Sequence, residues 1–301
     1  MSVIETKNLT KYYGKIKGIE NLNMTVEEGE VFGFIGPNGA GKSTAIRVLL
    51  NLIFPTSGSA TIFGLDVVKE KTRILQDVGY LPSEVFYYDG MRAIDLLKYS
   101  ASFYRTDGTA RIQELADRLN LDLRKKIDDL SYGNRKKVGI IQGLLHAPKL
   151  IILDEPTGGL DPLMQQTFFD ILREENRKGV TILFSSHILS EVQKMADRIG
   201  IIKDGTIISV ESMEQMRKEA YKKVTLTFDT PLDAQRFALP CSEGVSVQDS
   251  VYSCVYHGEA RMLVSAIANQ PLVDVNISEP DLEEVFMHYY VTDTPAHGAG
   301  E

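Results

Sequence analysis

Short runs of consecutive apolar residues recur through the first two thirds of the chain, and three of the four are followed by a helical pattern. The apolar runs cover residues 31–35, 78–81, 150–153 and 181–184. The helical patterns cover residues 42–52, 162–178 and 188–196. Continuous apolar runs are typical of strands buried on both faces, and their alternation with helices indicates a parallel, helix-covered sheet. The sequence therefore predicts an α/β fold for this part of the chain.

The pattern between residues 92 and 143 is mostly helical. Apolar positions three and four residues apart predict helices at residues 93–104, 109–119 and 134–145. We therefore expect a helical subdomain at about residues 92–143, inserted into the α/β part.

The pattern changes again after Met213. Strands are predicted at residues 223–228, 245–248, 251–256 and 273–277, with helices at 232–238 and 259–269. The order β-α-β-β-α-β predicts a small α+β domain with a ferredoxin-like fold. Twenty of the 24 glycines lie before residue 215, where tight loops must approach a ligand. We expect one domain at residues 1–214, a second at 215–291 that closes with a helix at 281–290, and a flexible tail at 292–301.

Composition and charge exclude several classes of function. The 301 residues include 33 Lys and Arg against 41 Asp and Glu, a formal net charge of −8, so no nucleic-acid partner is expected. The longest uncharged stretch, residues 48–65, holds a polar cluster that a membrane helix would not carry. Cys241 and Cys254 are too few and too loosely spaced for a metal site or a disulfide framework. The first residues lack the features of a signal peptide, so we expect a cytoplasmic protein unless a partner holds it at a membrane.

A glycine-rich loop joins the first apolar run to the helix that follows it. Residues 36–43 fit the pattern G-x-x-x-x-G-K-S in the strand–loop–helix context that this phosphate-binding motif requires. Backbone N–H groups and the helix N-terminus would bind phosphate, Lys42 would reach the β- and γ-phosphates, and the Ser43 hydroxyl would bind Mg²⁺. The motif predicts a P-loop NTPase fold with ATP and Mg²⁺ as cofactors. The residues expected to bind nucleotide here are Gly36, Pro37, Asn38, Gly39, Ala40, Gly41, Lys42, Ser43 and Thr44.

Two carboxylates end the third apolar run. Asp154 and Glu155 follow residues 150–153, at the edge of the sheet where the phosphate loop is expected. Asp154 is therefore predicted to bind Mg²⁺. Because neighbouring residues of a strand point to opposite sides, Glu155 would face away from Asp154 and polarise an attacking water.

These motifs, taken together, resemble those of the nucleotide-binding subunits of ATP-binding-cassette (ABC) transporters, over about residues 1–214. Residues 130–134, L-S-Y-G-N, stand where that family has its signature sequence, and residues 158–161, G-G-L-D, match its D-loop. His187, after the fourth apolar run, matches the switch histidine, and Tyr13 matches the aromatic residue that stacks on adenine.

The resemblance implies a head-to-tail dimer that closes on two ATP molecules and opens after hydrolysis. Ser131 and Gly133 of one subunit would contact the γ-phosphate bound by Lys42 of the other. The residues implied to be catalytic are Glu155, His187 and Lys42. The second subunit could be an identical or a related chain.

Two departures from the family pattern affect the predicted site. Ser83 stands where the family usually has Gln and is too short to reach Mg²⁺ and water. Tyr132 and Asn134 replace Gly and Gln of the usual signature, so one position is bulkier and the other is one carbon shorter. We expect an altered rate and not a loss of activity, because Lys42 and Glu155 are present.

Residues 279–286, E-P-D-L-E-E-V-F, resemble the closing segment of the drug- and antibiotic-resistance type of export ATPase, although they also read simply as a helix start. That type drives a separately encoded membrane permease, which implies a peripheral location on the inner face of the membrane. Phe86, Tyr87 and Tyr88 lie where such subunits receive the permease, but clustered aromatic residues are equally typical of a core.

Two alternatives stay open at this point. One is a non-transport ATPase of the same superfamily that acts in DNA repair or on ribosomes. Repair members insert long coiled coils and the ribosomal type carries two cassettes in one chain, and this sequence has neither feature. The other is a module that senses ATP with weak hydrolysis, because the signature is altered.

Overall fold

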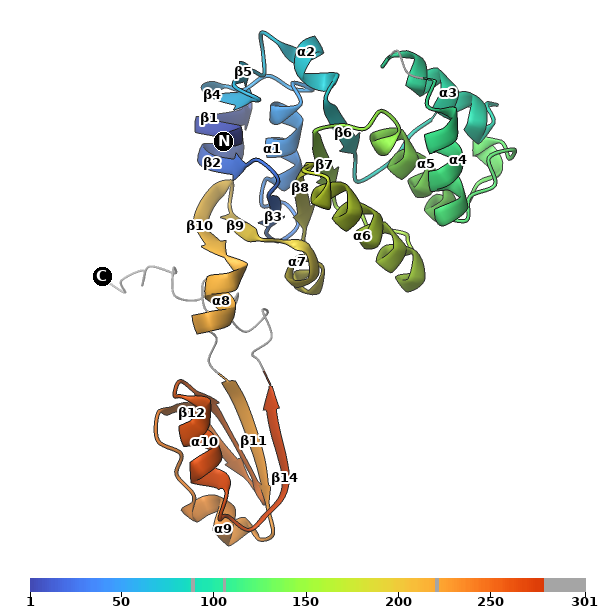
Figure 1. Cartoon of the computed structure of the whole chain (residues 1–301). Coiled ribbons are helices and arrows are strands. Elements are labelled where there is room, and N and C mark those ends of the chain that lie inside the picture. The colour runs from blue at the N-terminus through green and yellow to red at the C-terminus, as the bar shows by residue number, and fades with distance from the viewer. Residues whose placement is uncertain (88–89, 105–106, 220–221, 279–301) are drawn as a thin grey trace. The chain divides into compact units, whose positions relative to one another are not determined.

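A computed structural model of the chain describes residues 1–87, 90–104, 107–219 and 222–278, and the chain divides into two compact units between Met213 and Glu214 (Figure 1). The boundary predicted from the sequence, between residues 214 and 215, lies one residue later. Every helix within the described ranges is too short or too polar to cross a membrane.

A six-stranded sheet forms the centre of the first unit. Its strands, in spatial order, are β10 (Thr206–Ser212), β9 (Arg198–Lys203), β3 (Val31–Ile35), β8 (Thr181–Ser186), β7 (Leu150–Asp154) and β6 (Val78–Leu81). Neighbouring strands are parallel, apart from the antiparallel pair of β9 and β10. Every residue of β3, β7 and β8 is buried. The four predicted apolar runs are therefore confirmed as strands of one buried sheet.

The three helices predicted to alternate with these strands are present, with shorter bounds. They are α1 (Lys42–Leu49), α6 (Pro162–Arg177) and α7 (Leu189–Met195). The prediction for α1 ran to residue 52, but the backbone of Asn51 takes the left-handed conformation with φ of 47°, which ends the helix. Asp161 begins α6, because its carboxylate accepts a hydrogen bond from the Met164 N–H at 3.0 Å.

A second, antiparallel sheet that the sequence analysis did not predict lies on the other side of α1 (Figure 1). Its order is β2 (Ile16–Glu27), β1 (Ser2–Tyr13), β4 (Ser57–Ile62) and β5 (Leu65–Asp66). The alternation of apolar and polar residues along β1 and β2 is broken by register shifts and by left-handed residues at Asn8 and Asn21. Leu9, Ile19 and Ile46 belong to the core shared by this sheet, α1 and the central sheet.

The predicted helical subdomain consists of α3 (Ala93–Ser102), α4 (Thr109–Arg118), the short 3₁₀ helix η1 (Ile127–Asp129) and α5 (Tyr132–Leu144). The short helix α2 (Lys71–Leu75) precedes β6. The prediction began α5 at residue 134. It begins two residues earlier because Ser131 caps it, accepting a hydrogen bond from the Asn134 N–H. Two ion pairs join α4 to α6, namely Arg111–Glu175 and Arg118–Glu174, each at 2.6 Å.

The second unit contains the predicted β-α-β-β-α-β order. After α8 (Met213–Glu219) come β11 (Lys222–Phe228), α9 (Pro231–Arg236), β12 (Ser242–Gln248), β13 (Val251–Tyr256), α10 (Ala260–Ile267) and β14 (Leu272–Ser278). The four strands form one sheet in the order β12-β13-β11-β14, with antiparallel neighbours. Phe228, Tyr252 and Leu263 lie in its core, and Cys254 is buried there as a free thiol. The predicted helix at 281–290 and the tail lie outside the described residues.

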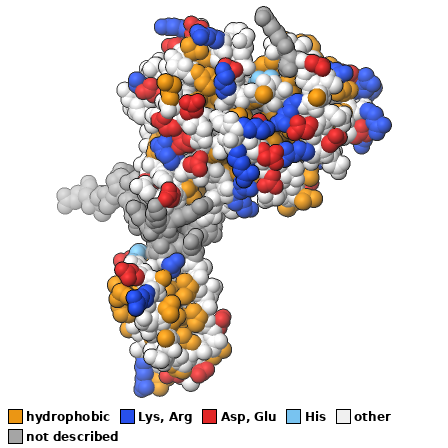
Figure 2. Space-filling model, viewed as in Figure 1, with side chains coloured by type: hydrophobic (Ala, Val, Ile, Leu, Met, Phe, Trp, Pro, Cys, Tyr) orange, Lys and Arg blue, Asp and Glu red, His pale blue; other side chains and the backbone are white. Residues whose placement is uncertain are grey.

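Apolar side chains gather on the visible surface of this second unit (Figure 2). Its exposed large apolar residues include Val264 on α10 and Val273, Val275 and Ile277 on β14.

Candidate functional site

The phosphate-binding loop lies between β3 and α1, with a backbone that depends on glycine. Gly39 and Gly41 have φ of 84° and 106°, which L side chains rarely adopt. A Cβ atom on Gly41 would also lie 2.6 Å from the carbonyl oxygen of Gly18. Gly41 is the N-cap of α1 and has no side chain to occupy the first N–H groups of the helix. These groups are therefore available to an anion.

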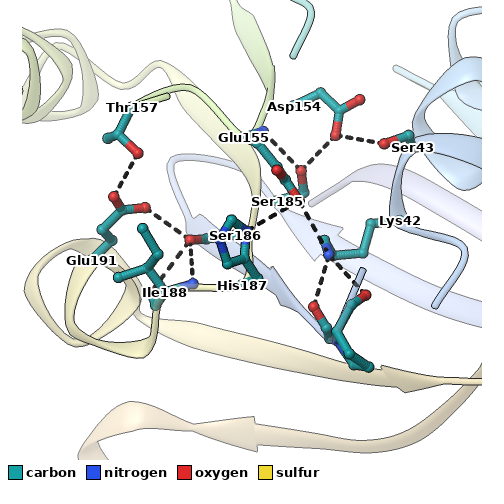
Figure 3. Close-up of polar contacts among 12 residues, drawn as sticks. Lys42, Ser43, Asp154, Glu155, Thr157, Ser185, Ser186, His187, Ile188 and Glu191 are labelled. Carbon is teal, nitrogen blue, oxygen red and sulfur yellow. Dashed lines mark hydrogen bonds and ion pairs between the residues drawn. The ribbon is translucent and has the colours of Figure 1, made fainter. Parts of the chain in front are cut away.

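Lys42 is buried, with 4% of its side chain exposed. Its ammonium donates hydrogen bonds to the carbonyl oxygens of Gly36 and Pro37, at 2.7 and 3.1 Å, and lies 3.4 Å from Glu155 Oε1 (Figure 3). The side chain thus lies against its own loop and the carboxylate end of β7.

Asp154, at the end of β7, is almost fully buried beside the loop. Its Oδ1 accepts hydrogen bonds from the hydroxyls of Ser43, at 3.0 Å, and Ser185, at 2.7 Å. Its Oδ2 is buried and has no hydrogen-bond partner within the described part of the chain. A buried carboxylate oxygen without a partner, next to a serine hydroxyl, matches the oxygen ligands that Mg²⁺ prefers. Ser43 and Asp154 therefore fit the predicted metal.

Glu155 lies beyond the end of β7, with φ of 46° in the left-handed region. Its N–H donates to the carbonyl oxygen and the hydroxyl of Ser185, at 3.2 and 3.0 Å. Its carboxylate faces Lys42 and His187, with 3.3 Å between Oε1 and His187 Nδ1. Strand alternation does not set the direction of the Glu155 side chain, because β7 ends at Asp154 and the backbone turns at Glu155.

His187 follows β8 and is about half exposed. The hydroxyl of the preceding residue, Ser186, accepts from the Ile188 N–H at 2.9 Å and donates to the buried Glu191 carboxylate at 2.8 Å. The Thr157 hydroxyl donates to the same carboxylate at 2.5 Å (Figure 3). Glu191 therefore joins the turn after Glu155 to the turn that carries His187. Ser185 and Glu191 were not predicted from the sequence, although a Glu four residues after a candidate histidine was a usable signal.

A cavity of about 340 Å³ is lined by seven of the twelve predicted nucleotide-binding residues, and Gly36, Pro37 and Ala40 of the loop are not among them. Its lining includes Tyr13, at the end of β1, together with Ser83 and Glu155. The residues of the loop that line it are Asn38, Gly39, Gly41, Lys42, Ser43 and Thr44. Tyr13 is 43% exposed, and the Lys11 ammonium lies 5.3 Å from its ring centroid. A partly exposed aromatic ring, a glycine-rich loop and a lysine ammonium that line one cavity suit the base and the phosphates of a nucleotide.

Ser131 and Gly133 are not among the residues that line this cavity. Both lie at the start of α5, and Gly133 packs on the D-loop, where a Cβ atom on Gly133 would be 2.6 Å from the Gly159 carbonyl oxygen. Within one chain the structure therefore gathers Tyr13, the phosphate loop and Glu155, but places the signature residues elsewhere.

Comparisons with known proteins agree with this geometry. Residues 19–158 match the family model described as ABC transporter. The chain is 37% identical to the bacitracin transport ATP-binding protein BcrA of Bacillus licheniformis, over 73% of each protein. It is 29% identical to the linearmycin resistance ATP-binding protein LnrL of Bacillus subtilis, over 95% of this chain and 97% of the relative.

Solved structures show the same fold for the first unit. An ATP-binding subunit of an ABC transporter superposes with a TM-score of 0.68 at 28% identity, covering 72% of this chain and 92% of that one. A dimeric ATP-binding cassette bound to ADP and Pi gives a TM-score of 0.65 at 25% identity, covering 70% and 98%. The chain therefore belongs to the ABC transporter family, as an ATP-hydrolysing nucleotide-binding subunit of the drug-resistance export type.

Proposed function

We propose that the chain binds ATP and Mg²⁺ in the cavity between Tyr13 and Glu155 and hydrolyses the ATP to drive export. The proposal rests on Asp154 Oδ2, which is buried in the carboxylate that accepts from Ser43 and has no hydrogen-bond partner among the described residues. Ser43 and Asp154 would hold Mg²⁺, which would neutralise charge on the phosphates during transfer. Tyr13 would stack on the adenine base.

The contact between Lys42 and Glu155 indicates how binding prepares the site. The Lys42 ammonium now donates to Gly36 and Pro37 and lies 3.4 Å from the Glu155 carboxylate. Phosphate oxygens that enter the loop would draw the ammonium to themselves, because they carry more negative charge than the carbonyl oxygens. The Glu155 carboxylate would then be free to accept a proton from the attacking water, with His187 on its other side.

We also propose a head-to-tail dimer with a second ABC subunit. Ser131 and Gly133 would complete the site of the other subunit, and their position outside this chain's own cavity supports that arrangement. Ser131 is exposed at the N-terminus of α5, where the helix dipole favours the negative charge of a γ-phosphate.

An apolar groove beside the loop after β6 would receive the membrane permease. This groove, of about 340 Å³, lies between the C-terminal end of α1, β6 and α5. Phe86 on its rim is 85% exposed, whereas Tyr87 packs against α5, donates to the Arg135 carbonyl oxygen at 3.2 Å, and has its pKa raised by burial. Tyr88 lies outside the described residues. Through this contact the subunit would be held at the inner face of the membrane.

We further propose a ferredoxin-like fold for the second unit, as an accessory domain of about residues 215–291. Support comes from the sheet order, in which the first strand β11 lies between β13 and β14 and every neighbour is antiparallel. β11 pairs within this sheet and the nucleotide cavity is lined by residues of the first unit, so no direct role in ATP binding is assigned to it.

The test is ATP binding and turnover of the purified full chain. Lys42→Ala removes the ammonium that the loop offers to the γ-phosphate, so ATP affinity and turnover should both be lost. Lys149→Met, which removes an exposed lysine paired with Asp77, is the matched control and should behave as wild type. Wild-type turnover by Lys42→Ala would refute the proposed site.

The permease groove is tested separately, by substituting Phe86 on its rim. Co-purification of an integral-membrane protein that is lost in Phe86→Asp would support the groove, and unchanged co-purification would count against it.

A further inference from the structure

Lys136 is a buried lysine beside the nucleotide site that the assignments above do not use. It lies on α5, five residues after Ser131, and 0% of its surface is exposed. Most lysines are exposed because the ammonium loses its hydration on burial. A fully buried lysine therefore needs hydrogen-bond partners that replace the lost water.

The hydrogen bonds of the Lys136 ammonium go to backbone carbonyl oxygens of two segments that are far apart in sequence. Two acceptors, Pro82 and Ser83, lie in the loop after β6, at 2.9 and 2.8 Å. The third is the carbonyl oxygen of Glu155, at 3.4 Å. An ammonium has three N–H donors, and here all three have an acceptor. One side chain therefore joins α5, the loop after β6 and the turn that carries Glu155.

The Glu155 peptide needs such support, because its φ of 46° is uncommon for a residue with a side chain. Ser185 holds the N–H of this residue from one side, and Lys136 holds its carbonyl from the other. The charge of the ammonium is retained at neutral pH: burial lowers the pKa of Lys136 to about 8, while the negative charges of Asp154, Glu155 and Glu84 oppose that shift.

The loop after β6 is tied to α5 a second time, by the hydrogen bond from Tyr87 to Arg135. Pro82, Tyr87 and Phe86 also line the apolar groove proposed for the permease. Lys136 thus binds the carbonyl oxygen of Pro82, which lines the groove, and the carbonyl oxygen of Glu155, which lines the nucleotide cavity.

We propose that Lys136 is a positioning residue for Glu155: it fixes the Glu155 peptide relative to the loop after β6, so that the carboxylate is aligned with the attacking water. This inference rests on the role of Glu155 proposed above. In this chain the side chain of Ser83, in the loop after β6, is too short to reach the water. The alignment of Glu155 would therefore depend on the contact between Lys136 and the Glu155 backbone.

A purely structural lysine would affect folding alone, and the kinetic constants distinguish the two roles. Lys136→Met keeps the length of the side chain and removes its three donors. Because Lys42 and the phosphate loop still bind ATP, KM for ATP should stay within about twofold, while kcat falls about 10- to 100-fold, as expected for a displaced catalytic group. Lys136→Arg retains donors and should recover part of kcat. Arg111→Met, which breaks the Arg111–Glu175 pair away from the site, controls for lost stability.

The experiment is a double-mutant cycle with Glu155→Gln, measured as steady-state ATP turnover and fluorescent-nucleotide binding by the full chain. If Lys136 acts through Glu155, Lys136→Met should lower turnover in the wild-type background and change the residual turnover of Glu155→Gln by less than about twofold. An equal further fall in the Glu155→Gln background, or a kcat for Lys136→Met no lower than that of Arg111→Met, would overturn the inference. If Lys136→Met does not fold, Lys136→Gln, which keeps an amide donor, replaces it in the same cycle. Wild-type turnover by Glu155→Gln alone would instead refute the role of Glu155.

Discussion

The ring of Tyr132 packs directly on Gly159, and it occupies the space that a side chain at Gly159 would need. The ring carbons that a Cβ atom would meet are Cδ1 and Cε1, and the Tyr132 hydroxyl lies 3.5 Å from the Ser83 carbonyl oxygen. The residue that departs from the usual signature is thus matched to a glycine of the D-loop. The start of α5 and the D-loop, both of which would face the second subunit of the proposed dimer, are therefore in direct contact.

Gly159→Ala should therefore destabilise the fold and weaken assembly. Its φ of 80° is strained for alanine, and the added methyl group meets the Tyr132 ring, which together should lower the free energy of unfolding by about 2–4 kcal/mol. Urea denaturation measures this loss, and size-exclusion chromatography with ATP measures dimer formation.

Gly64→Ala is the matched control, because Gly64 has φ of 72° but no atom of the described residues lies within 4 Å of an added Cβ. It should show the cost of the backbone alone, about 1 kcal/mol. The double variant Tyr132→Gly with Gly159→Ala should lose the clash and regain the difference. Equal losses for Gly159→Ala and Gly64→Ala would show that the ring contact does not matter.

Asp154→Asn should weaken Mg²⁺ dependence and nucleotide affinity together. The substitution keeps the size of the side chain but removes the negative charge and one acceptor oxygen, next to a hydroxyl donor from Ser43 and another from Ser185. The Mg²⁺ concentration for half-maximal ATP binding should rise at least about tenfold. Isothermal titration with ATP at several Mg²⁺ concentrations measures it. An unchanged Mg²⁺ requirement would move the metal site away from Asp154.

His146 should make the fold less stable in mild acid. Burial lowers its pKa from 6.5 to about 4, against weaker opposite effects of the Val78 carbonyl and of Asp77. Between pH 6.5 and 4 the unfolded chain therefore binds more protons than the folded one, so stability falls as the pH decreases through this window, by roughly 1 kcal/mol per pH unit. The ring stacks on Tyr104 at 3.7 Å, and its Nδ1 has no partner within the described residues, so protonation there would gain nothing.

Urea denaturation of the wild type and of His146→Gln at pH 7 and pH 5 isolates this contribution. The wild type should lose more stability between the two pH values than the variant. Equal losses would show that another group is responsible.

The parts of the fold that could be predicted are those whose pattern is local and regular. The buried strands β3, β7 and β8 are apolar throughout, and the loop after β3 carries its motif in consecutive residues. The sheet of β1 and β2 was missed because its register shifts and left-handed Asn8 and Asn21 break the alternation that identifies a half-buried strand.

The contacts that complete the site were hidden for a different reason. Lys136 and Glu155 are 19 positions apart, and their contact depends on how α5 packs beside β6 and β7. Glu191 and Thr157 are 34 positions apart and meet only because α7 and the turn after β7 converge. A sequence shows that such polar residues exist, whereas their burial and their partners follow from the tertiary packing of segments between them.

The left-handed backbone of Glu155 was also outside the reach of the sequence argument. Strand alternation assigns a direction only to residues within the strand, and β7 ends at Asp154. The roles proposed for Asp154 and Glu155 do not depend on alternation, because the structure gives each carboxylate a different set of neighbours.

Glu155→Gln should trap the ATP-bound dimer, because it separates binding from hydrolysis. The amide keeps the shape of the side chain and leaves Lys42 and the phosphate loop in place, so ATP affinity should persist. Losing the group that polarises water should lower turnover by about 10²–10⁴-fold, or roughly 3–5 kcal/mol of barrier. If Ser131 of one chain and Lys42 of the other hold the same ATP, arrested hydrolysis leaves the dimer closed. Size-exclusion chromatography after incubation with ATP should then show a stable dimer for Glu155→Gln, and a monomer for the wild type once its ATP is consumed. Glu114→Gln, at an exposed carboxylate that pairs with Arg111, should behave as wild type. Wild-type turnover by Glu155→Gln would require another base, and Glu84 and His187 would be the next residues to substitute.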